Sequence, residues 1–133
     1  MNTQPQLTPP SGFRLWSGIV VTGLVALFLS FDGLTKVIRV APVVKASEKL
    51  GLPSNSIIPI GIVLLACTVA YVIPKTSLVG AILLTGYLGG AVAIHVSARS
   101  GAFPIGFSLG CGALVWLGLF LREPKLTGLI FLR

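Results

Sequence analysis

Residues 76–98, TSLVGAILLTGYLGGAVAIHVSA, contain no Asp, Glu, Lys or Arg and are bounded by Lys75 and Arg99. A helix rises 1.5 Å per residue, so a helix over this stretch is roughly 34 Å long. That length is enough to cross a bilayer whose hydrocarbon core is ~30 Å thick. The stretch therefore predicts a membrane-spanning helix.

Three more stretches lack charged residues, namely 15–31, 50–74 and 100–121. The whole chain is 54% hydrophobic and 10% charged, whereas a soluble domain is about 25% charged. No stretch alternates between apolar and polar residues as the strands of a membrane barrel do. We therefore predict an all-α integral membrane protein, a four-helix up-down-up-down bundle with spans at about 13–36, 55–73, 76–98 and 104–121.

Outside the spans, two segments differ in character. Residues 1–12 are polar and include Pro5, Pro9 and Pro10, so we expect a mobile N-terminal tail before a single domain over 13–133. The loop at 37–54 contains VVKASEKL at 43–50, which can form two helical turns ended by Gly51. This short helix is predicted either to lie on the membrane surface or to be a solvated connector.

The formal charge of +7 comes from ten Lys and Arg residues against three acidic residues. The cations lie at the edges of the apolar stretches instead of forming a nucleic-acid patch, so we predict membrane lipids as partners and no nucleic acid. Five cations fall at each predicted membrane face, and the positive-inside rule gives no orientation. Trp16, Tyr71 and Trp116 are interpreted as interfacial aromatics at the face that holds both chain ends.

Small residues form two stripes at helical spacing. Gly86 and Gly90 make a GxxxG pair that Ala93 and Ser97 continue, and Gly106 and Gly110 repeat the spacing, continued by Ala113. Such faces allow close contact between membrane helices. We expect these glycines to pack the third span against the fourth, or to leave a face for a homo-oligomer.

Four ionisable residues are predicted to meet at one membrane face. Asp32 and Lys36 end the first span and His95 and Arg99 end the third, and odd-numbered spans run in the same direction. Asp32 and Lys36 are four residues apart in the order that favours a helical ion pair. The four groups either neutralise one another and fix two helix ends, or let His95 exchange a proton near neutral pH.

Tyr87 lies in the middle of the third span, where a tyrosine hydroxyl needs a partner or a water-lined cavity. Tyr87, Ala91 and His95 recur at four-residue spacing, so they follow one side of the helix. This side is a candidate pocket for a quinone head group or another small amphipathic ligand, with Tyr87 and His95 as binding residues. A hydrogen bond from Tyr87 to a neighbouring helix is the alternative.

The sequence offers no recognisable catalytic centre. Cys67 and Cys111 form no CxxC motif and are expected at different depths, which disfavours a disulfide or a zinc site. One histidine cannot provide both ligands of a bis-histidine haem within one chain, so a second ligand would have to come from a partner. Nucleotide loops, serine triads and paired catalytic carboxylates are also missing from the sequence. We predict no catalytic residues and no metal site.

Four segments resemble the DoxX-like family of small bacterial four-helix membrane proteins: SFDGLTK at 30–36, LGLP at 50–53, IPKTSLVGAILLTGYLGGAVAIHV at 73–96 and WLGLFLREPKL at 116–126. The resemblance implies a multi-pass protein of the bacterial cytoplasmic (inner) membrane. Relatives named for DoxX and DoxD are associated with quinol oxidase or thiosulfate:quinone oxidoreductase assemblies. By this resemblance the chain is expected to be an accessory or structural subunit beside larger membrane redox subunits, with quinone as the possible cofactor.

Overall fold

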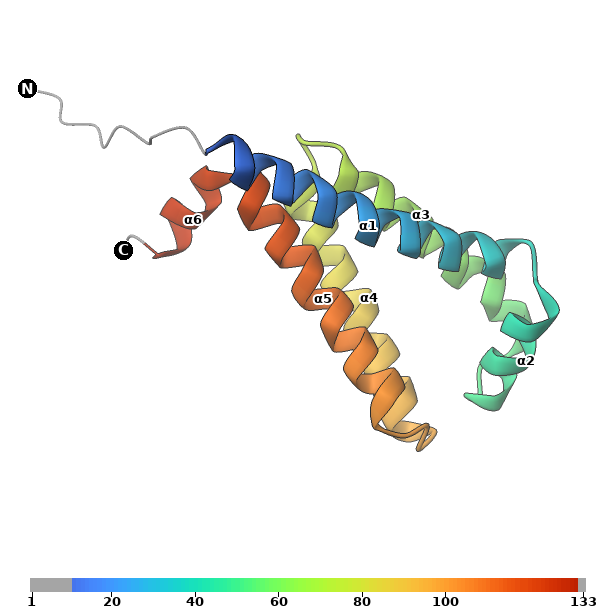
Figure 1. Ribbon diagram of the computed structural model, residues 1–133. Helices are drawn as coiled ribbons and strands as arrows, with labels where there is room; N and C mark the ends of the chain where they lie inside the picture. Colours follow the sequence, from blue (N-terminus) through green and yellow to red (C-terminus); the bar gives the residue numbers. More distant parts are fainter. Residues whose placement is uncertain (1–10, 132–133) are drawn as a thin grey trace, which may run out of the picture.

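The computed structural model describes residues 11–131, and every regular element in that range is helical (Figure 1). The elements are α1 (Gly12–Val37), α2 (Ala41–Lys49), the 3-10 turn η1 (Ser54–Ser56), α3 (Ile57–Val72), α4 (Ser77–Ser97), α5 (Ala102–Arg122) and α6 (Pro124–Phe131). Most of the predicted N-terminal tail, residues 1–10, lies outside the described residues. Gly12 does not belong to a tail, because α1 begins there after Ser11, whose side chain accepts a hydrogen bond from the Arg14 backbone nitrogen.

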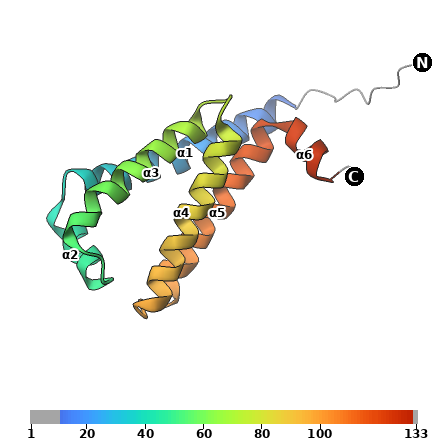
Figure 2. The same cartoon turned by 180° about the vertical axis from the view of Figure 1, so that it is seen from behind.

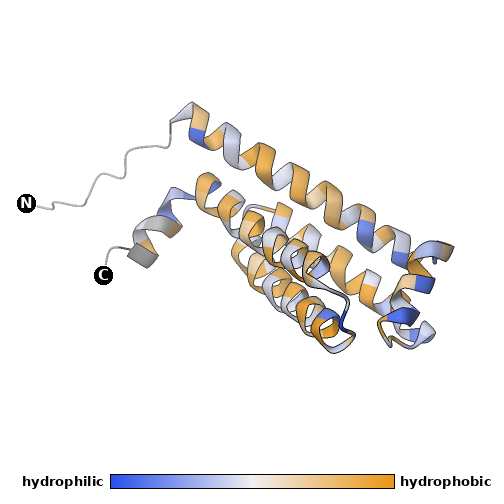
Figure 3. Ribbon diagram, turned by 60° about the horizontal axis from the view of Figure 1, so that its bottom comes forward, coloured by the Kyte–Doolittle hydropathy of each residue, from blue (hydrophilic) through white to orange (hydrophobic). Residues whose placement is uncertain are grey.

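Four helices are long and apolar enough to cross a membrane: Gly12–Val37, Ser54–Val72, Ser77–Ser97 and Ala102–Arg122. These bounds lie within two residues of the predicted spans. Apolar residues cover the long helices around much of their circumference, while hydrophilic residues gather at helix ends and on α2 (Figure 3). Leu27 is 70% exposed and Leu109 is 61% exposed, as expected where lipid is the surrounding solvent. The protein is an all-α membrane bundle, as predicted.

The four long helices form two antiparallel pairs. α1 packs against α3 and α5, and α4 packs against the same two helices, so each span contacts spans that run in the opposite direction. Figures 1 and 2 show that the α1/α3 pair and the α4/α5 pair meet near α6 and the turn between α3 and α4. They diverge toward α2 and the turn between α4 and α5. We call these the closed end and the open end of the bundle.

Glycines allow the helices to touch at the closed end. A Cβ on Gly80 of α4 would lie 2.2 Å from the backbone nitrogen of Tyr71 in α3. A Cβ on Gly118 of α5 would lie 2.7 Å from the Thr22 hydroxyl oxygen of α1 and 2.9 Å from the Tyr71 hydroxyl oxygen. A side chain at residue 80 would therefore push α4 away from the backbone of α3, and a side chain at residue 118 would displace the Thr22 and Tyr71 hydroxyl groups.

The glycines singled out by GxxxG spacing lie elsewhere. A Cβ on any of them would meet nothing within 4 Å: Gly86, Gly90, Gly106 and Gly110. The contact between α4 and α5 instead passes Leu88 and Gly112, whose Cβ would lie 3.8 Å from a Leu88 methyl group. Packing of α4 on α5 through the GxxxG glycines is therefore not confirmed within the chain. Spacing identifies a narrow face of a helix, but it does not identify which neighbour that face meets.

The interpretation of Tyr71 as an interfacial aromatic is also wrong. Instead of lying at the lipid interface, its side chain is fully buried between the helices of the closed end. Its hydroxyl donates a hydrogen bond to the Val115 carbonyl oxygen at 2.7 Å, and its own carbonyl oxygen accepts from Arg122 at 3.2 Å and from Ser77 at 2.8 Å. Arg122 also donates to the Ser77 hydroxyl oxygen at 3.1 Å. Tyr71 thus joins α3, α4 and α5, and Arg122 is a structural residue as well as an edge cation.

Candidate functional site

The divergence of the helix pairs leaves a cleft at the open end, with a cavity volume of about 610 Å³. All four long helices and α2 contribute to its walls, which are mostly apolar and include Leu29, Leu50, Leu88, Ile94 and Phe107. The side of α2 that carries Pro42, Val43 and Ala46 faces this cleft. α2 therefore contributes a wall of the cavity at the open end.

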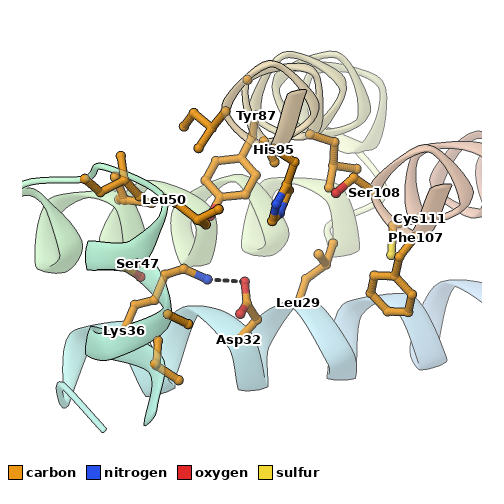
Figure 4. Close-up of a pocket in the computed structure, with 18 of the residues that line it drawn as sticks. Leu29, Asp32, Lys36, Ser47, Leu50, Tyr87, His95, Phe107, Ser108 and Cys111 are labelled. Carbon is orange, nitrogen blue, oxygen red and sulfur yellow. Dashed lines mark hydrogen bonds and ion pairs between the residues drawn. The ribbon is translucent and has the colours of Figure 1, made fainter. Parts of the chain in front are cut away.

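Charged groups enter the cleft from α1. Lys36 and Asp32 form an ion pair one helical turn apart, as their spacing predicted (Figure 4). The Lys36 side chain is 14% exposed and that of Asp32 is 36% exposed. A charge at this depth is costly without a partner, and each group of the pair supplies the partner of the other beside an apolar cavity.

Tyr87 and His95 approach the ion pair from α4. Figure 4 shows both side chains projecting toward Asp32 and Lys36 from across the cleft. They lie on one side of α4 because eight residues are slightly more than two turns. The Nδ1 atom of His95 is buried and has no hydrogen-bond partner within the described part of the chain.

The structure brings together three of the four ionisable residues expected at this face. Asp32, Lys36 and His95 line the cleft, whereas Arg99 is exposed beyond the end of α4 and does not line it. Arg99 has a φ of 53°, in the left-handed region that ends a helix. The chain therefore turns away at Arg99, after the end of α4. The position of Arg99 along the sequence gave no indication of this turn. Ala91, Gly86 and Gly90 also line the cleft.

Sequence reasoning missed the contributions of α2 and α5 to the cleft. Ser47 is 5% exposed and lines the cleft beside Leu50, and α5 adds Phe107, Ser108 and Cys111. The apolar side of residues 43–50 was visible in the sequence, but it was assigned to the membrane surface or to a solvated connector. Cys67 and Cys111 are both buried and unbridged.

The arrangement suits the polar end of an amphipathic molecule. An imidazole nitrogen without a partner and a phenol stand opposite a neutralised pair of charges, and apolar side chains surround all four. Hydrogen-bonding groups converging in a largely apolar cavity are typical of small-molecule sites. Within residues 11–131, no group of three or more His, Cys, Asp or Glu residues is placed to hold a metal ion.

The chain was compared with known families, curated proteins and solved structures. The model of the DoxX-like family matches residues 20–118, which is well over half of the 133 residues. No curated protein and no solved structure matches the chain. The matched range contains the Asp32–Lys36 segment and all of α4, including Tyr87 and His95, and it ends before LREP at 121–124. This multi-pass membrane protein therefore belongs to the DoxX-like family.

Proposed function

We propose that the protein binds the polar head group of a small lipid-soluble molecule, of the quinone class, in the cleft at the open end. The observation that carries this proposal is the convergence of the His95 and Tyr87 side chains on the Asp32–Lys36 pair, in a cleft whose walls are mostly apolar. A head group in the cleft would lie against both of these side chains and the apolar walls.

The chemistry of a quinone head group matches these residues. Its carbonyl oxygens accept hydrogen bonds, which the Tyr87 hydroxyl and an imidazole N–H donate. The reduced form carries hydroxyl groups, and these donate hydrogen bonds that an imidazole nitrogen can accept. The head is uncharged, so the closed Asp32–Lys36 pair leaves no net charge facing it. The flat apolar part of the ring would pack against the leucine and phenylalanine walls.

We also propose a setting for this binding, which the family resemblance supports. The DoxX-like resemblance supports an accessory or structural subunit, without catalysis of its own, associated with a quinone-linked redox assembly in the bacterial inner membrane. In that setting the protein would hold quinone near larger membrane subunits that carry out electron transfer. A helix from such a subunit, or from a second copy of the chain, would lie against the outer faces of the bundle, where large apolar side chains such as Leu27 and Leu109 are exposed.

The binding proposal is tested with a quinone head group that carries no hydrocarbon tail. The probe is 2,3-dimethoxy-5-methyl-1,4-benzoquinone, titrated calorimetrically into the protein in lipid nanodiscs. His95→Ala and Tyr87→Phe are each expected to weaken binding roughly tenfold, the effect of one lost hydrogen bond to a buried group. Arg99→Ala is the matched control, because Arg99 ends the same helix but does not line the cleft. No binding by the wild type, or equal binding by all four proteins, would overturn the proposal.

A further inference from the structure

A second cavity lies on the α1–α5 side of the bundle, next to the head-group cleft. Its volume is about 370 Å³. Leu24 and Val25 of α1 and Leu114 of α5 line it, and Gly106 and Gly110 of α5 line it with backbone where side chains would otherwise stand. We call this cavity the α1–α5 groove. Its lining contains no charged residue, unlike that of the cleft.

Two phenylalanines separate the groove from the cleft. Phe28 of α1 and Phe107 of α5 meet edge to face, with ring centroids 5.2 Å apart. Both residues line both cavities, and so does Cys111. The rings remain 42% and 46% exposed, so they are not held tightly by other side chains. The groove and the cleft are therefore adjacent spaces with a shared wall of two aromatic rings.

The groove extends from the polar cluster toward the middle of the membrane. Leu24 precedes Asp32 by eight residues on α1, which places it roughly 12 Å closer to the closed end by helical rise. On α5, which runs in the opposite direction, Gly106 to Leu114 covers a similar length. An amphipathic molecule in a bilayer keeps its polar head toward the interface and its tail toward the centre. The groove follows the direction that such a tail would take.

We infer that the α1–α5 groove holds the hydrocarbon tail of the ligand whose head group occupies the cleft, so that the ligand is a single-chain tailed molecule that enters sideways from the lipid past Phe28 and Phe107. This inference rests on the proposed function. Three observations support it: the shared wall, the lack of charge in the groove and its direction. The inference also gives a role to Gly106 and Gly110. Within residues 11–131 a Cβ on either glycine would meet nothing within 4 Å, and the lack of a side chain leaves the groove open.

Filling the groove tests the inference. Gly106→Leu and Gly110→Leu place side chains in the groove, and a Cβ at either position meets nothing within 4 Å, so the bundle accommodates the change.

The readout is the affinity for the benzoquinone probe without a tail and for the same ring with a decyl tail. In the wild type the decyl probe is expected to bind more tightly. Each leucine variant is expected to lower the affinity for the decyl probe roughly three- to tenfold, because packing against protein is what the tail gains over lipid. Affinity for the tail-less probe is expected to stay unchanged.

Gly89→Leu is the matched control, because Gly89 is an exposed helical glycine that lines neither cavity. Comparison with Gly89→Leu corrects the apparent affinity of the decyl probe for partitioning of its tail into the bilayer. That partitioning is the same for every variant. If the tail-less probe fails to bind the wild type, the proposed function fails. If the tail-less probe binds but the decyl probe gains nothing, or its gain survives Gly106→Leu and Gly110→Leu, the inference alone is overturned. Unchanged tail-less binding in the leucine variants shows that they are folded.

Discussion

Gly80→Leu is expected to prevent the bundle from closing. The first atom of any side chain at residue 80 would lie 2.2 Å from the Tyr71 nitrogen and 2.4 Å from the Tyr71 Cα atom. Backbone atoms inside a helix cannot move aside as a flexible side chain can, so α4 must separate from α3. Overpacking of a core typically costs 1–3 kcal/mol, and we expect Gly80→Leu to cost at least about 3 kcal/mol because the clash is with backbone. Thermal unfolding followed by circular dichroism in detergent measures the loss.

The same substitution on the outside of α4 gives the control. A Cβ on Gly89 meets nothing within 4 Å, and leucine forms helices more readily than glycine. Gly89→Leu is therefore expected to unfold at the temperature of the wild type or above it. Equal stability of the Gly80→Leu and Gly89→Leu proteins would show that α3 and α4 do not meet at Tyr71.

The Asp32–Lys36 pair is expected to give strongly non-additive effects. Lys36→Met leaves the Asp32 carboxylate beside the apolar cleft without its partner, and Asp32→Asn does the same to the Lys36 ammonium group. Each single change is expected to cost about 1–3 kcal/mol, between the values for exposed and for fully buried pairs. The double variant removes both charges and is expected to lose less than the sum. Chemical unfolding of the four proteins in one detergent gives the coupling energy.

Additive losses in that cycle would mean that the two charges act independently, contrary to the ion pair in the structure. Lys45→Met is a suitable reference, because Lys45 is exposed on α2 and does not line the cleft. Its removal is expected to change the unfolding free energy by no more than about 0.5 kcal/mol.

The spans and the ion pair could be predicted because their signals are local. Length without charge decides whether a segment crosses a bilayer, and the spacing of Asp32 and Lys36 decides whether they share a helix face. The approach of His95 to Asp32 and Lys36 required only one more step, the parallel direction of the first and third spans. These predictions did not depend on how the helices tilt.

A pocket along Tyr87 and His95 was predicted from the sequence, but the shape of the cleft and its other walls could not be, because they depend on the angle between two helix pairs. That angle depends on contacts between helices, such as Gly80 of α4 with Tyr71 of α3 and Gly118 of α5 with Thr22 of α1. Gly80 and Gly118 belong to no GxxxG pair. Of the glycines that do, Gly86 and Gly90 line the cleft, and Gly106 and Gly110 line the α1–α5 groove. Tyr71 was misread for a similar reason, because an aromatic residue near a span end is equally compatible with a lipid interface and with a buried hydroxyl.

Native mass spectrometry of the protein, extracted from its own membranes in a mild detergent, tests ligand binding in the cleft most directly. We expect the wild type to carry one lipophilic small molecule of a single mass, released on collisional activation, and we expect the Tyr87→Phe/His95→Ala double variant to have lost it. A wild-type protein that carries only bulk phospholipid, or equal occupancy by the same molecule in both proteins, would contradict the account.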